Sequence, residues 1–108
     1  MANINVTWTA LGAGVDDVDS VEVVRCDDGS KTTEAHFQAA LDAVHPGNDY
    51  AAQGLVSVEN GLGKTSSALT TPDSVGVGTY YYCVAAKNTG GYKVGAGDNS
   101  AVDSIVVA

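Results

Sequence analysis

The strongest constraint on the fold of this chain is a run of strand-forming residues, Thr79–Ala86, in its last third. Three tyrosines are followed there by Cys-Val-Ala-Ala, and aromatic side chains favour the extended backbone of a strand. Successive side chains of a strand point to opposite faces, so Tyr80 and Tyr82 share one face while Tyr81 and Cys83 share the other. The run therefore predicts a strand, and its register decides which of the two faces is turned towards the interior.

Alternation of apolar and polar residues predicts several further strands. In Asn3–Ala10 the side chains of Ile4, Val6 and Trp8 alternate with polar residues, so we expect them to share one buried face. The other predicted strands are Val21–Cys26, Leu55–Val58, Ser66–Leu69 and Ala101–Val107. Glycine-rich loops are expected at Leu11–Asp19 and Asn88–Ser100. The sequence thus predicts a mainly β fold.

One segment, Thr33–Val44, departs from this pattern. Its apolar residues recur at helical spacing, which predicts an amphipathic helix. They are Phe37, Ala40, Leu41 and Val44. His45-Pro46-Gly47 follows, and proline cannot continue a helix. We expect this helix to pack across one opening of a β-sandwich.

The length and charge of the chain limit its organisation and its partners. Its 108 residues suit a single domain, 1–108, and we see no linker or repeat. The net charge of −8 repels phosphate backbones, so no nucleic acid is expected as a partner. No apolar segment has the roughly 20 residues of a membrane span, and no signal peptide is visible, so we expect no membrane partner and synthesis in a cytoplasm.

A resemblance to a known family enters at Pro72–Asn88, which reads PDSVGVGTYYYCVAAKN. This segment resembles the E–F corner and strand F of fibronectin type III domains, particularly those of bacteria and phages. The resemblance implies an immunoglobulin-like β-sandwich in which Tyr80 is the corner tyrosine, with its hydroxyl bonded back to the preceding loop. It also implies that Tyr82, Val84 and Ala86 face the core.

Three more landmarks follow the order of that family. Val6-Thr7-Trp8 is similar to strand B with its buried tryptophan, and Val21-Glu22-Val23 is similar to strand C. Ala101–Val107 is similar to strand G, so Asn88–Ser100 corresponds to the F–G loop. The expected core consists of Trp8, Val21, Val23, Phe37, Leu41, Tyr80, Tyr82, Val84 and Ala86. The chain departs from the family in its inserted helix and in having little room for strand A before Trp8.

An immunoglobulin variable domain is the alternative family. Tyr81-Tyr82-Cys83 resembles its strand F signature, but that fold places a cysteine on strand B before the tryptophan of strand C. Here Trp8 precedes both cysteines. A register shifted by one residue would turn Tyr81, Cys83 and Ala85 inward instead.

The two cysteines, Cys26 and Cys83, lie on the strands that correspond to C and F. In the register above both point to the outer face of their sheet. Two free thiols on a half-exposed sheet are expected in a chain without a secretion signal, and a disulfide is the alternative.

Loop residues supply the remaining candidate sites. Oxygen ligands from Asp16, Asp17, Asp19 and Asp98 form a weak candidate for Ca²⁺, although solvated loop acids are the simpler interpretation. Tyr92 and Lys93 form a possible binding loop, with the ring of Tyr92 available to stack on a ligand. No arrangement of catalytic side chains can be assembled, so we expect neither an enzyme nor a cofactor.

The first predicted strand is a candidate partner edge. If strand A is absent, the edge formed by Asn3, Ile4, Asn5, Val6 and Thr7 is open to a strand from another chain. We therefore expect these residues either to join a neighbouring subunit or to be covered by the chain's own terminus.

The resemblance and the charge together suggest a function. Tailed bacteriophages use such domains in their virions, and an acidic surface keeps an abundant protein soluble. We therefore expect a non-catalytic structural or accessory virion protein (a decoration, cement or surface subunit) that binds capsid or tail proteins, with a homo-oligomer as a further option. The alternative is an adhesion module that binds carbohydrate, such as a host surface glycan, or protein through its B–C and F–G loops.

Overall fold

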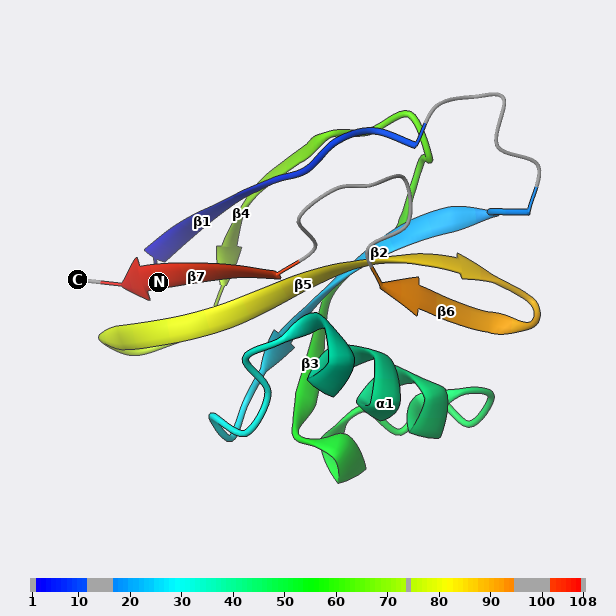
Figure 1. Cartoon of the computed structure of the whole chain (residues 1–108). Coiled ribbons are helices and arrows are strands. Elements are labelled where there is room, and N and C mark those ends of the chain that lie inside the picture. The colour runs from blue at the N-terminus through cyan, green and yellow to red at the C-terminus, as the bar shows by residue number, and fades with distance from the viewer. Residues whose placement is uncertain (1, 12–16, 74, 95–101, 108) are drawn as a thin grey trace.

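A computed structural model of the chain describes residues 2–11, 17–73, 75–94 and 102–107, and in these residues the fold is mainly β (Figure 1). The strands are β1 (Ala2–Thr7), β2 (Ser20–Cys26), β3 (Leu55–Leu62), β4 (Ala68–Asp73), β5 (Gly78–Asn88), β6 (Gly91–Val94) and β7 (Val102–Val107). The helix α1 is Glu34–Val44, and a short 3-10 helix, η1, is Ala51–Gln53. Each segment that the sequence predicts as strand or helix overlaps one of these elements.

The strands form two sheets. In the smaller sheet β1 and β4 pair antiparallel, from Ala2 opposite Asp73 to Thr7 opposite Ala68. The larger sheet has the order β3-β2-β5-β6, and β7 also pairs with β5. The first half of β5 pairs with β7 and its end pairs with β6, so both lie on the side of β5 opposite β2.

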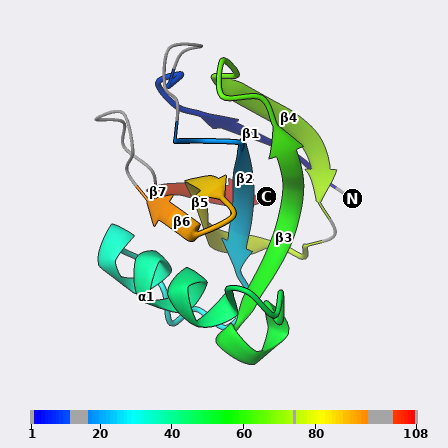
Figure 2. The ribbon, with the colours of Figure 1, turned by 90° about the vertical axis from the view of Figure 1, so that its right-hand side faces the viewer.

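The molecule has three layers, which Figure 2 shows edge on: the small sheet, the larger sheet and α1. The small sheet covers one face of the larger sheet, and α1 covers the other face. The expectation that α1 crosses an opening of a sandwich is therefore wrong. Its apolar stripe is wide enough to cover a sheet face, and the outer face of β2 and β5 is apolar enough to receive it.

The first core lies between the two sheets. It contains Ile4, Val6, Trp8, Val21, Val23, Tyr82 and Val84. All of the residues expected in the core are buried except Tyr80, which is half-buried at the margin of this cluster. Tyr82 and Val84 thus face the small sheet, in the register that the resemblance implied.

The second core lies between the larger sheet and α1. It contains Val24, Cys26, Phe37, Ala40, Leu41, Val44, Leu55, Cys83, Ala85 and Tyr92. Cys83 and Ala85 are therefore buried as well as Tyr82 and Val84, so the two registers are not exclusive: β5 has a core on each face. The alternation of side chains along β5 defines two faces of the strand. The face with Cys83 and Ala85 is shielded from solvent only because α1 packs on it.

One local prediction is corrected. The segment Asn88–Ser100, expected to be a loop, contains β6, which forms a hairpin with β5; residues 95–100 lie outside the described part. A second tyrosine on the face of Tyr80 bonds back towards the preceding connection: the hydroxyl of Tyr82 lies 2.8 Å from Asp73 Oδ2 at the end of β4. The role expected of Tyr80 as the corner tyrosine stays a prediction.

Candidate functional site

The outer edge of β1 is the candidate interaction site, and the hydrogen bonds of the small sheet define it. The N–H of Trp8 donates to the main-chain oxygen of Ser67 at 2.9 Å, so Trp8 points its backbone towards the β4 side. Backbone groups alternate along a strand, so Ile4 and Val6 also point towards β4. The N–H and C=O groups of Asn3, Asn5 and Thr7 therefore point to the opposite side. Within the described residues β1 pairs with β4 alone.

The side chains along this edge suit an approaching strand. Ile4 and Val6 are fully buried in the core between the sheets, while Asn3, Asn5 and Thr7 are exposed. Asn5 Oδ1 accepts a hydrogen bond from Thr70 Oγ1 at 3.0 Å across the small sheet. No residue from Ala2 to Leu11 carries a charge. The edge thus lacks the charged residues and prolines with which proteins commonly block strand addition.

The edges of β3, β4 and β6 carry such blocking features. On β4, Pro72 lies opposite Asn3, a position whose backbone nitrogen points outward and, as proline, offers no N–H. On β3, Glu59 stands at a shift of register against Val23, and such irregularities bend an edge away from partners.

The edge of β6 is capped by the side chain of Gln38 in α1. Gln38 Nε2 donates to the main-chain oxygen of Tyr92 at 2.9 Å, and Gln38 Oε1 accepts from the N–H of Val94 at 2.8 Å. One amide group thus makes the two hydrogen bonds that a neighbouring strand would make. This leaves the edge of β1 as the open one among the edges of β1, β3, β4 and β6.

The cap on β6 gives a first prediction. Replacing Gln38 by methionine keeps the length and helix propensity of the side chain but removes both hydrogen bonds to β6, together with the exposed one to Asp42 within the helix. We expect the variant to lose about 1–2 kcal/mol of unfolding free energy and the amide of Val94 to exchange at least about tenfold faster with deuterium. Gln53→Met in η1 is the control; equal exchange of Val94 in both variants would contradict the cap.

A polar clasp joins the two sheets at the far end of β4. Arg25 of β2 is buried and pairs with Asp73, and it lies 3.2 Å from Asp27 Oδ1. Asp73 also accepts the hydroxyl of Tyr82. Burial lowers the pKa of Arg25, but its hydrogen bonds to Asp73 and Asp27 outweigh burial and leave the pKa raised. Burial, and then the bond to Asp73, raise the pKa of Tyr82, so this hydroxyl remains a donor.

A second polar cluster is centred on Glu22, which is 0% exposed and contacts the β5–β6 hairpin through Lys87 and Tyr92. Its carboxylate lies 3.1 Å from Ser57 Oγ, 3.3 Å from the hydroxyl of Tyr92 and 3.5 Å from Lys87 Nζ. The hydroxyl of Tyr50 lies 2.8 Å from that of Tyr92. Burial first, and then the bond to Tyr92, raise the pKa of Tyr50. Every oxygen of this carboxylate is satisfied by protein groups, which suits a structural role.

Both cysteines are buried, so the expectation of half-exposed thiols is wrong. They do point to the outer face of the larger sheet, but α1 covers that face. Both are free thiols in the structure. Burial, with a smaller contribution from the charge of Glu34, raises the pKa of Cys83, so the unreactive thiol form is favoured.

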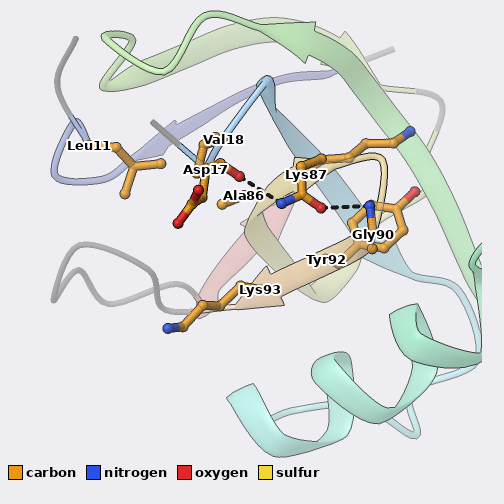
Figure 3. A pocket seen from close by; sticks show the side chains of 10 residues that line it. Leu11, Asp17, Val18, Ala86, Lys87, Gly90, Tyr92 and Lys93 are labelled. Atoms are coloured by element: carbon orange, nitrogen blue, oxygen red, sulfur yellow. Dashed lines mark hydrogen bonds between the residues drawn. The ribbon is translucent and has the colours of Figure 1, made fainter. Parts of the chain in front are cut away.

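A hollow of about 570 Å³ lies at the pole where β2 begins and β5 ends (Figure 3). Asn88 ties its two sides together, since Nδ2 donates to the main-chain oxygen of Asp17 at 2.7 Å and Oδ1 accepts from the N–H of Gly90 at 2.8 Å. Lys93 is exposed at the rim. Tyr92 is only 8% exposed, with Lys87 Nζ 5.3 Å from the centre of its ring. The expected use of Tyr92 as a stacking platform is therefore wrong.

The weak calcium candidate falls partly outside the described residues, because Asp16 and Asp98 belong to 12–16 and 95–101. Among the residues that are described, no three side chains of histidine, cysteine, aspartate or glutamate converge as a metal site would require. Asp19 instead donates its N–H to the main-chain oxygen of Lys87 at 2.9 Å, and so fixes the start of β2.

Sequence reasoning missed Glu22, Lys87 and Gln38. Glu22 alternates with Val21 and Val23, which indicated a solvent-facing side chain. The sequence signal that could have predicted the burial of Glu22 was the amphipathic helix. Its apolar stripe must pack on an apolar surface, and that packing buries the residues on the second face of β2.

No helix in the described ranges has the length and apolar character needed to cross a membrane. Comparison of the chain with protein-family models, with curated proteins and with solved structures finds no match.

Proposed function

We propose that the chain is a non-catalytic attachment protein, a structural or accessory subunit of a tailed-bacteriophage virion that binds its partners by strand addition at the outer edge of β1. The observation that carries this proposal is the contrast between that edge and the edges of β3, β4 and β6. The edges of β3, β4 and β6 bear Glu59, Pro72 and Gln38, respectively, whereas β1 offers three outward-pointing residues without charge or proline.

The arrangement of strands supports the finer family assignment that we propose. The small sheet, in which β1 pairs with β4, corresponds to strands B and E of a fibronectin type III domain without strand A. In the larger sheet, β3, β2 and β5 correspond to strands C′, C and F, and β6 and β7 together correspond to a divided strand G. In that family strand A pairs with strand B, which corresponds here to β1, and within the described residues β1 pairs with β4 alone. An extended segment of another protein fits this position, with main-chain bonds for affinity and alternate side chains for specificity.

The test compares two proline variants on opposite edges of the small sheet. Asn5→Pro removes an N–H that points away from β4, and Thr70→Pro removes one that points away from β1. Each also breaks the bond between Thr70 and Asn5, so the two variants share that loss. Each chain is mixed with particles that lack it, from the virus that encodes it, and co-sedimentation is measured. We expect Thr70→Pro to bind like the parent chain and Asn5→Pro to lose at least about 90% of binding.

Two outcomes would contradict the proposal. One is the absence of the parent chain from purified virions by mass spectrometry, together with failure to co-sediment. The other is equal binding by both variants, which would place the attachment surface elsewhere.

The alternative function is a binding module for carbohydrate or protein at the hollow between the start of β2 and the β5–β6 hairpin. Its volume of about 570 Å³ and the exposed Lys93 favour a small polar ligand over a stacked ring, because Tyr92 is buried. A glycan array with reproducible hits on the parent chain would favour this alternative.

A further inference from the structure

The edge of β1 is complementary to itself in backbone geometry. Asn3, Asn5 and Thr7 are the residues whose N–H and C=O groups point away from β4. In an antiparallel pair, opposed residues of this kind exchange two hydrogen bonds. A second copy placed about a two-fold axis at Asn5 sets Asn5 opposite Asn5 and Asn3 opposite Thr7. Three such pairs give about six hydrogen bonds, and none of the bonds to β4 is disturbed.

The side chains are also complementary under the same axis. On the inner face Ile4 stands opposite Val6 of the other copy, and both stay buried in the core of their own chain, so the pairing needs no change in that core. On the exposed face Asn5 meets Asn5, and Asn3 meets Thr7, so polar groups that can donate and accept are opposed. No charged side chain is opposed to another.

The charge of the chain narrows the choice of partner. With a net charge of −8, most surfaces of two copies repel one another. The stretch from Ala2 to Leu11 carries no charge, so it is where two copies can approach at the lowest electrostatic cost. This stretch has no acidic side chain to attract a basic strand and no basic side chain to attract an acidic one. An uncharged strand in which apolar and polar residues alternate, as they do in β1, fits it best.

We propose that β1 pairs with β1 of a second copy of this chain, in antiparallel register centred on Asn5, so that two small sheets form one continuous four-stranded sheet of order β4-β1-β1-β4. This inference rests on the proposed use of β1 as the attachment edge and names its partner. The pairing leaves α1 on the outside of the dimer, because α1 covers the face of the larger sheet that is turned away from the small sheet (Figure 2). The contact is small, so we expect a dissociation constant in the micromolar to millimolar range.

The register can be tested with opposite charges at its centre. In Asn5→Lys two lysines are directly opposed, and in Asn5→Glu two glutamates are, so each variant alone should raise the dissociation constant about 5- to 10-fold. An equimolar mixture of the two should form a heterodimer at least as tight as the parent dimer. Asn5→Lys also reduces the net negative charge. If general repulsion between two copies controlled association, this variant would dimerise more tightly than the parent chain, which is the opposite of the effect expected from direct pairing at position 5.

Sedimentation velocity from about 10 μM to about 1 mM, at roughly 0.15 M salt to screen the net charge, measures these constants. Thr70→Lys and Thr70→Glu, on the outer edge of β4, are the controls and should dimerise like the parent chain. A parent chain that is monomeric at the highest concentration would overturn the inference, as would dimerisation that responds equally at positions 5 and 70. A monomer whose binding to particles is still lost in Asn5→Pro would overturn self-pairing and leave the proposed function standing. A dimer that shows the predicted charge dependence but does not bind particles would support self-pairing and overturn the proposed function.

Discussion

Replacing Phe37 by alanine is expected to lower the free energy of unfolding by about 3–5 kcal/mol. Phe37 is fully buried between α1 and the larger sheet, in the cluster that includes Leu41 and Cys83. Its removal takes away the largest apolar contact of the helix and leaves a cavity that neighbours on a rigid sheet cannot fill. Domains of this size have only about 5–15 kcal/mol in total, so the variant should be close to unfolding at 37 °C.

The fluorescence of Trp8 and the circular dichroism of the helix measure this loss independently during urea unfolding. Trp8 lies in the other core, so the two signals report the two faces of β5. We expect coincident transitions, because both cores share β2 and β5. Phe37→Leu is the matched control and should lose less than about 1.5 kcal/mol. A loss below about 1 kcal/mol in the alanine variant, or helix melting well before the Trp8 signal, would show that α1 is not an integral layer.

Replacing Glu22 by alanine should be the next most damaging change, with an expected loss of about 2–4 kcal/mol. The substitution leaves the hydroxyls of Tyr92 and Ser57 without their common acceptor in a dry site. Lys87 is 24% exposed and can turn towards water, so its lost ion pair contributes less than that of a fully buried cation.

Two variants separate the role of the carboxylate from that of general burial. Glu22→Gln keeps an acceptor and the side-chain shape, so we expect it to lose only about half as much as the alanine variant. Glu59→Ala, on the half-exposed part of β3, should change the unfolding free energy by less than about 0.5 kcal/mol. Urea unfolding monitored through the fluorescence of Trp8 measures the unfolding free energies of the three variants. Equal losses in Glu22→Ala and Glu59→Ala would show that the buried hydrogen bonds of Glu22 do not stabilise the fold.

The elements that the sequence predicted well are those with a regular period. Ile4, Val6 and Trp8 alternate, and Phe37 and Leu41 recur at helical spacing, so local pattern alone identified β1 and α1. The hairpin strand β6 escaped prediction because its four residues lie in a glycine-rich segment. Its stability comes from pairing with β5 and from the cap of Gln38, neither of which is local in sequence.

The candidate sites divide in the same way. The pairing of β1 with β4 alone, within the described residues, agrees with the edge expected for this strand, and its use by a partner stays a prediction. The burial of Tyr92 and of both cysteines was not expected, because it depends on where α1 packs. When a helix packs on the outer face of a sheet, the outward-pointing residues of the strands beneath it become core residues. The sequence pattern of those strands does not indicate this packing.

Residue-by-residue hydrogen exchange in a dilute solution of the parent chain tests most directly whether β1 presents an open edge. The amides of Ile4 and Val6 point towards β4 and should be protected, whereas those of Asn3, Asn5 and Thr7 should exchange almost as fast as in an unfolded chain. Raising the protein concentration or adding particles should protect the second set. Equal protection of both sets in the dilute monomer would mean that the edge is already covered, and would contradict strand addition at β1.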